Sequence, residues 1–139
     1  MKSVFISFAY TDEDQTAVLG RMTRINQKFD EAGVTSYCDL FDDEIKHLTS
    51  WREFMVDALE KIKSYDHLLF IITSPRRSEG MLMEAGAAYT LGKGLAVMQH
   101  VSSRDATNLP TICDQAYKWS DDIGLETQIQ KYIKEQCNA

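Results

Sequence analysis

The carboxylate of Glu84 is the group in this sequence best placed to do chemistry. It falls in the first or second turn of a helix predicted over about residues 81–91, six residues after Ser78. A carboxylate near a helix N-terminus is stabilised as an anion by the helix dipole and by the free backbone amides. Such an anion could stabilise an oxocarbenium-like sugar cation or attack the anomeric carbon of a sugar. An acidic residue here can also serve helix stability alone, so position leaves both roles open.

A second carboxylate, Asp39, follows the second predicted strand. A neutral purine or pyrimidine leaves a sugar poorly unless it is protonated, so its departure needs a general acid of raised pKa. Asp39 is the candidate for that acid. Its alternative role is to cap the turn that follows the strand, as Asp residues commonly do.

Apolar runs alternate with amphipathic stretches along the chain. We expect strands over residues 4–8, 34–39, 68–73, 94–100 and 116–119. Helices are expected over about 14–32, 81–91 and 124–137, with another that begins after a cap at Thr49 or Ser50. Alternating βα units of this length predict a flavodoxin-like three-layer sandwich: a five-stranded parallel sheet of order 2-1-3-4-5 with helices on both faces.

The helical spacing also predicts which side chains turn inward. In the helix over 81–91, Glu84 shares a face with Met81, Ala88 and Leu91, while Leu82, Ala85, Gly86 and Tyr89 face the sheet. In the helix after Ser50 the expected inner face is Trp51, Met55, Ala58, Leu59 and Ile62. Trp51 has a second possible role, which is to stack on a base.

In an open sheet of this order, ligands bind beyond the carboxyl ends of the strands, where the strand order reverses. That rule places the loops 8–13, 39–50 and 74–81 around one crevice. Ser78 and Gly80 could offer a hydroxyl and bare amides to a phosphate, with Arg76 and Arg77 adding charge nearby. The residues expected to contact the substrate are Phe8, Ala9, Tyr10, Asp12, Trp51, Ser78, Gly80 and Met81.

Length, composition and charge limit the classes of function and partner that are expected. The 139 residues fit a single domain over 1–139, 44% of them are hydrophobic and the net charge is −6. This acidity argues against a nucleic acid polymer or an anionic membrane as partner, because both are negatively charged and bind basic protein surfaces. No apolar run approaches a membrane span, and the N-terminus enters a strand pattern at once, so we expect a cytoplasmic protein.

No motif for a metal or a bound cofactor is present. The three cysteines show no CxxC spacing and the three histidines are dispersed. There is no GxGxxG fingerprint and no Walker loop, so hydride transfer and kinase chemistry have little support. We therefore expect neither a metal nor a cofactor.

Several segments together resemble TIR domains. Residues 4–8 (VFISF) followed by 11–14 (TDED) are similar to the opening strand and acidic turn of that family, and 33–39 (GVTSYCD) to its second strand. Residues 64–74, then Ser78 and Glu84, are similar to its third strand and to the helix start that carries the catalytic glutamate of NAD-cleaving members. The likeness covers about residues 2–90. It departs from the family at Met81-Leu82, where an aromatic–Cys pair is usual.

The segment around Glu84 also resembles the nucleoside 2-deoxyribosyltransferase and nucleotide N-glycosidase family. Residues 78–88 (SEGMLMEAGAA), continuing to Gly92-Lys93, match its glutamate helix more closely than they match that of TIR domains. In that family the glutamate is the nucleophile on the sugar. The departure here is Phe8-Ala9-Tyr10, where a Gly/Pro-containing loop is usual.

Both resemblances imply cleavage of an N-glycosidic bond of a nucleotide, with Glu84 facing the sugar. The TIR likeness predicts cleavage of the nicotinamide–ribose bond of NAD by hydrolysis, cyclisation or base exchange. The alternative is a deoxyribosyltransferase-like enzyme or nucleotide N-glycosidase that uses the same glutamate. A third hypothesis is a non-enzymatic TIR-type interaction module. Self-association is expected in the first and third cases.

Overall fold

In the computed structural model, which describes residues 2–9, 13–103 and 106–137, five parallel strands form one sheet. Its order is β2-β1-β3-β4-β5, and the flavodoxin-like class predicted from the sequence is confirmed. Strand β1 pairs with β2 on one side and β3 on the other, so the strand order reverses there. The strands are β1 (Val4–Phe8), β2 (Ser36–Cys38), β3 (His67–Ile72), β4 (Gly94–His100) and β5 (Gln115–Trp119).

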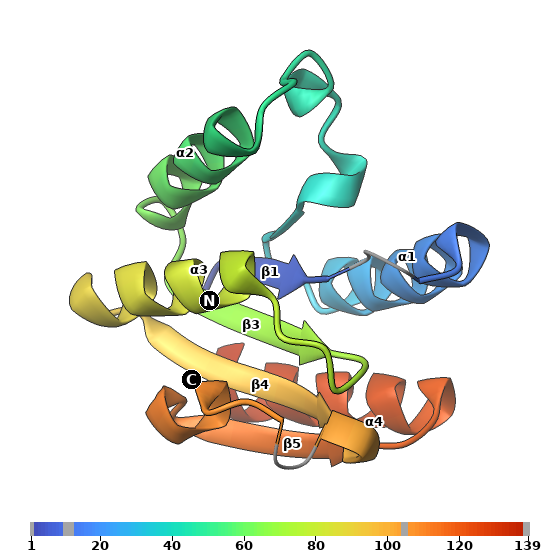
Figure 1. The fold of residues 1–139 in the computed structure, drawn as a ribbon. Helices are drawn as coiled ribbons and strands as arrows, with labels where there is room; N and C mark the ends of the chain where they lie inside the picture. Colours follow the sequence, from blue (N-terminus) through green and yellow to red (C-terminus); the bar gives the residue numbers. More distant parts are fainter. Residues whose placement is uncertain (1, 10–12, 104–105, 138–139) are drawn as a thin grey trace.

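Within the described residues, four α-helices cover the two faces of the sheet (Figure 1). They are α1 (Gln15–Glu31), α2 (Trp51–Ile62), α3 (Glu79–Thr90) and α4 (Asp122–Tyr132). Each begins after a side chain that accepts a hydrogen bond from a backbone amide of the first turn: Asp14, Ser50, Ser78 and Asp121. None of the helices in the described part of the chain is both long and apolar enough to span a membrane.

The core lies in two layers because successive side chains of a strand point to opposite faces of the sheet. Val4 and Ile6 pack in the cluster that α1 and α4 cover, and Phe5 packs in the cluster beneath α2 and α3. Strand β3 is buried on both sides, as its unbroken apolar run predicts. A rigid central sheet therefore fixes the ends of β1 and β3, from which the candidate site is built.

Some predicted boundaries were wrong. Strand β2 comprises Ser36–Cys38 rather than 34–39, because this edge strand pairs with β1 over three residues. Helix α3 begins at Glu79 rather than at Met81, because Ser78 accepts the hydrogen bond from the Met81 amide and so acts as the N-cap. Helix α4 ends at Tyr132, and Ile133–Cys137 continue as a turn of π-helix.

The predicted inner face of α3 was also wrong in part. Ala85 is buried with Met81, Glu84 and Ala88, but Tyr89 is 66% exposed. Leu82, Gly86 and Leu91 are exposed as well. The inward stripe follows the i, i+3, i+4, i+7 spacing from Met81, which turns Leu82, Gly86 and Tyr89 outward. Glu84 therefore lies on the inner face, between the helix and the sheet.

Trp51 is not part of the core, contrary to one of its two predicted roles. Trp51 is 58% exposed, and the buried residues of α2 are Met55 and Ile62. Trp51 lies in the first turn of α2, which follows the 39–50 segment at the upper edge of the view in Figure 1. Its aromatic surface is thus available at the rim of the cavities described below.

Candidate active site

Glu84 lies in the second turn of α3, where the helix passes over the carboxyl end of β1. Its side chain is 9% exposed, and its Oε1 accepts a hydrogen bond of 2.6 Å from the hydroxyl of Ser7. Ser7 is itself buried on β1. A strand and a helix far apart in sequence thus fix one oxygen of this carboxylate, and the second oxygen is left for other partners.

Burial raises the pKa of Glu84 to about 7. Two further groups act on it: the Ser7 hydroxyl lowers the pKa, and the negative charge of Asp39 raises it. Removal of a carboxylate from water disfavours its charged form, whereas a donated hydrogen bond favours it. Near neutral pH this carboxyl therefore changes between its acid and its anion at small energetic cost.

Asp39 begins a short 3₁₀ turn directly after β2. Burial raises its pKa to about 6, the Leu40 amide lowers it, the charge of Asp42 raises it and that of Lys61 lowers it. Among the described residues the buried Oδ1 atom of Asp39 has no hydrogen-bond partner. An unpaired buried oxygen is costly and calls for an explanation, which a bound substrate would supply.

Glu84 and Asp39 line one cavity of about 260 Å³ at the point where the strand order reverses. Of the ten site residues predicted from the sequence, eight line this cavity: Phe8, Ala9, Asp39, Trp51, Ser78, Gly80, Met81 and Glu84. The other two, Tyr10 and Asp12, lie outside the described residues. The three predicted loops therefore meet around Glu84. The roles assigned to these residues remain predictions.

A second cavity of about 330 Å³ adjoins the first and is lined by charged side chains of both signs. Arg76 and Arg77 line it, together with hydroxyl residues at the end of β3. The wall between the two cavities is shared: Ala9, Trp51, Ser78, Gly80 and Met81 line both. The first cavity has carboxylates and no described arginine or lysine, whereas the second has Glu13 and Glu79 besides its two arginines. Among the described lining residues, the cationic side chains therefore lie on the side of the second cavity.

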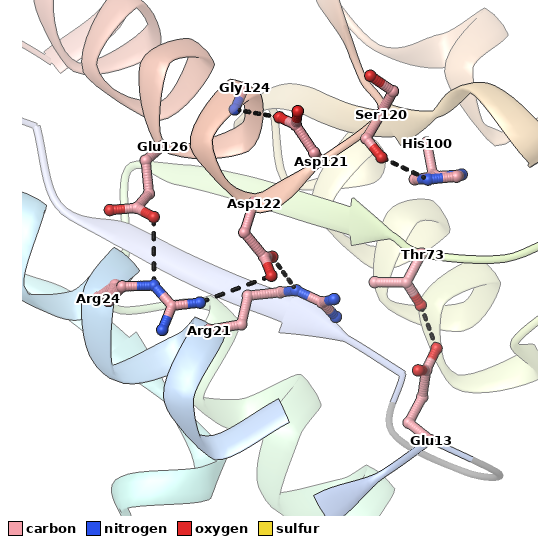
Figure 2. A network of polar contacts seen from close by, with 10 residues as sticks. All are labelled: Glu13, Arg21, Arg24, Thr73, His100, Ser120, Asp121, Asp122, Gly124 and Glu126. Atoms are coloured by element: carbon pink, nitrogen blue, oxygen red, sulfur yellow. Dashed lines mark hydrogen bonds and ion pairs between the residues drawn. The ribbon is translucent and has the colours of Figure 1, made fainter. Parts of the chain in front are cut away.

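A hydrogen bond joins two residues that line the second cavity, Thr73 and Glu13. Thr73, just after β3, donates to Oε1 of Glu13 over 2.6 Å, as Figure 2 shows. Arg77 donates from Nε to the backbone oxygen of Ala106 over 3.0 Å. Both Glu13 and Arg77 line the cavity. His100, in contrast, contacts Trp119 and Ser120 at the end of β4 and lines neither cavity.

Sequence reasoning missed four residues that build the site: Ser7, Tyr37, Phe54 and Asp57. All four line the cavity of Glu84. Ser7 is the polar residue in an otherwise apolar strand, and this exception could have identified it. Asp57 stands four residues before Lys61 in α2 and pairs with it over 2.6 Å. That i, i+4 spacing is visible in the sequence, but its proximity to Glu84 is not.

No protein-family model matches the sequence, and no curated protein matches it. Solved structures do resemble the fold. The CMP N-glycosidase BcmB of Clostridium botulinum superposes with a TM-score of 0.70 at 18% identity, over 94% of this chain and 99% of that one. BlsM gives a TM-score of 0.70 at 16% identity, over 99% of this chain and 95% of that one.

A third similar structure is the 2-deoxyribosyltransferase of Bacillus psychrosaccharolyticus. Its TM-score is 0.61 at 24% identity, over 89% of this chain and 90% of that one. At these identities the likeness establishes a shared fold. Function must be argued from the cavity of Glu84 itself.

Proposed function

We propose that this protein is an enzyme that breaks the N-glycosidic bond of a nucleotide, with Glu84 as the nucleophile on the sugar. The observation that carries the proposal is the pair of carboxyls in one cavity, Glu84 held by Ser7 and Asp39 beside it, both with raised pKa values. Carboxyls with perturbed pKa values in a cleft are typical of catalytic sites. The shared fold with an N-glycosidase and a deoxyribosyltransferase supports the same class of reaction.

In the first step the carboxylate of Glu84 attacks C1′ of the sugar. A bond forms between a Glu84 oxygen and C1′, while the C1′–N bond breaks and its electron pair leaves with the base. Asp39 gives its proton to the leaving nitrogen. In the second step water attacks C1′, Asp39 takes a proton from that water, and the bond to Glu84 breaks. Both carboxyls then regain their starting states, and a second base in place of water would give transfer.

This cycle needs Glu84 ionised while Asp39 holds a proton. The charge on Asp39 is one of the causes that raise the pKa of Glu84, so Glu84 ionises more easily when Asp39 is protonated. The two carboxyls consequently titrate as a coupled pair, and near pH 6–7 the pair holds about one proton. Because the pKa of Glu84 is the higher of the two, this proton lies mostly on Glu84, and the reactive form, with the proton on Asp39, is the minor one of the two singly protonated forms. We expect a bell-shaped pH profile with its optimum in this range.

The cavity of Arg76 and Arg77 favours a nucleotide over a nucleoside. It adjoins the Glu84 cavity at Ser78 and Gly80, where the N-terminus of α3 presents its amides. A 5′-phosphate placed there leaves the sugar and the base to the carboxylate-lined cavity. Trp51 and Phe54, both exposed at the start of α2, offer aromatic surface to the base.

Of the two resemblances noted in the sequence, the similar structures support the deoxyribosyltransferase and N-glycosidase likeness. We therefore place cleavage of a purine or pyrimidine nucleotide before the cleavage of NAD. The two reactions differ in their need for Asp39. Nicotinamide leaves a cationic nucleotide as a neutral molecule, whereas a neutral base requires the proton.

A substrate panel tests the proposal. The protein is incubated with ribo- and deoxyribonucleoside 5′-monophosphates, the matching nucleosides and NAD, and base release is measured by chromatography. We expect release from at least one monophosphate, with a KM at least about tenfold below that of its nucleoside, since a charge-assisted contact contributes about 1.5–3 kcal/mol. The double variant Arg76→Gln/Arg77→Gln should remove this preference.

No base release from any substrate, at protein concentrations up to those at which self-association is complete, would refute the enzymatic proposal. It would favour the non-enzymatic module. Self-association itself remains a prediction, and sedimentation of the intact protein over a range of concentrations measures it.

A further inference from the structure

Lys61 joins three segments of the chain behind the wall of the Glu84 cavity. Its ammonium donates to Oδ2 of Asp57 over 2.6 Å, to Oδ2 of Asp42 over 2.7 Å and to the hydroxyl of Tyr37 over 3.2 Å. It also lies 5.0 Å from the centre of the Tyr37 ring. These partners come from β2, from the 39–50 segment and from α2 itself.

Two of the three partners face the site. Tyr37 and Asp57 line the Glu84 cavity, while Asp42 does not. Tyr37 in turn donates to Oδ2 of Asp42 over 2.7 Å, and its ring stacks on Phe5 of β1. The cavity wall is thus connected through one ammonium group to the end of β2 and to the loop that follows it.

Packing alone holds this wall weakly. Helix α2 buries Met55 and Ile62 and half-buries Ala58 and Leu59 against the core, while its first turn carries the exposed Trp51. The 39–50 segment has two single 3₁₀ turns with no fully buried residue. Polar contacts must therefore supply much of the order in this region. Lys61, 25% exposed, makes charged hydrogen bonds to both parts.

The charge of Lys61 also acts on the pKa values of neighbouring groups. Burial alone would lower the pKa of Lys61, but its bonds to Asp42, Asp57 and Tyr37 raise it overall, so the ammonium stays charged. The charge of Lys61 lowers the pKa of Asp39 and that of Tyr65, and bonding to Lys61 is the largest cause that lowers the pKa of Asp42. Lys61 is thus electrostatically linked to the proposed acid without lining the cavity.

We propose that Lys61 is a positioning residue that fixes Asp57 on the wall of the active site and ties the 39–50 segment, with Asp39 at its start, to α2. This inference rests on the proposed function for its role in catalysis. With Oδ2 of Asp57 held by Lys61, its other oxygen is available to an N–H or O–H of the substrate.

The test compares Lys61→Met, which removes the ammonium and keeps most of the chain length, with Lys61→Arg and with Lys63→Met. Lys63 is the matched control, because it follows the same helix and pairs with the exposed Glu60 away from the cavity. We expect kcat/KM of Lys61→Met to fall by about tenfold or more, mostly through KM, as loss of a charged hydrogen bond predicts. Lys61→Arg should recover to within about threefold of the parent, and Lys63→Met should match it.

A pH profile separates positioning from a general loss of structure. Because Lys61 lowers the pKa of Asp39, its removal should move the alkaline limb of the profile to higher pH. The ionisable groups around Lys61 are Tyr37, Asp39, Asp42, Asp57 and Tyr65. A kcat/KM and an alkaline limb equal to those of the parent in Lys61→Met would overturn the proposal. A loss in Lys63→Met as large as in Lys61→Met would do so too.

Amide hydrogen exchange keeps the test independent of activity. Exchange in the 39–50 segment and the first turns of α2 should become about tenfold faster in Lys61→Met, and exchange in α4 should not change. If Lys61→Met does not fold, Asp42→Asn replaces it, since this variant loosens Lys61 from the segment while Asp57 keeps its partner. Unchanged exchange in 39–50 would refute the positioning role, whereas inactivity of the parent on every nucleotide would refute the proposed function alone.

Discussion

Replacement of Glu84 by glutamine should stabilise the protein at neutral and alkaline pH while it removes activity. The pKa of Glu84 is raised from an ordinary value of 4.5 to about 7. The folded protein therefore binds this proton more tightly than the unfolded chain does. The stability that this bound proton contributes is fully present below about pH 4.5 and is lost as pH rises through 7. Glutamine resembles the protonated acid at every pH and avoids that loss.

The magnitude follows from the two pKa values. A shift of one pKa unit corresponds to about 1.4 kcal/mol. The rise in the pKa of Glu84 on folding therefore lowers the free energy of unfolding by about 3 kcal/mol at pH 8, relative to a side chain that stays neutral. In a domain of this size, avoiding that loss raises Tm by about 10 °C. Ser7 can still donate to the amide oxygen of glutamine, so the hydrogen bond in the folded state need not be lost.

The assay is urea unfolding of the parent and Glu84→Gln at pH 4, 6 and 8, followed by circular dichroism. We expect the two proteins to be about equally stable at pH 4 and the variant to gain steadily toward pH 8. Glu79→Gln is the control, because Glu79 is exposed in the first turn of the same helix. A parallel pH dependence in the parent and Glu84→Gln would refute the claim that burial raises the pKa of Glu84.

Three further predictions concern turnover and binding. Ser7→Ala should lower kcat about tenfold with KM unchanged, because the anion of Glu84 loses a donor worth about 1.4 kcal/mol, and Ser36→Ala in β2 should not. Asp39→Asn should lower kcat about 100-fold or more on a nucleotide with a neutral base, because that base needs a proton to leave. On a nicotinamide nucleotide the loss should be less than about threefold. Equal losses on both substrates would show that Asp39 is not the general acid. Trp51→Ala should raise KM several-fold. It should leave Tm within about 2 °C of the parent, since the side chain is largely exposed. A large drop in Tm would show that Trp51 is a packing residue.

Much of the fold could be predicted from the sequence because local patterns carry it. The apolar runs of β1 and β3 predicted their strands, and the strand order followed from the regular βα succession. Faces of helices were harder to predict. In α3, small and apolar residues occur on all sides, so hydrophobic periodicity could not show that Leu82 and Tyr89 are exposed.

The candidate site was predictable at the level of loops and not of contacts. The rule on strand order located Glu84 and Asp39 at one crevice, and both line the same cavity. The bond from Ser7 to Glu84 joins residues 77 positions apart, and no local pattern encodes such a pairing. Likewise, the link of Lys61 to Asp42 and Tyr37 depends on how α2 and the 39–50 segment pack together.

The role of Glu84 is tested most directly by base release in Glu84→Gln. The measurement is the rate of base release from the monophosphate that the parent cleaves best, for parent and variant at pH 6.5 and equal concentration, with both shown to be folded. Loss of the nucleophile should reduce the rate by a factor of about 1000 or more. Release by Glu84→Gln at a rate close to that of the parent would show that Glu84 does not attack the sugar.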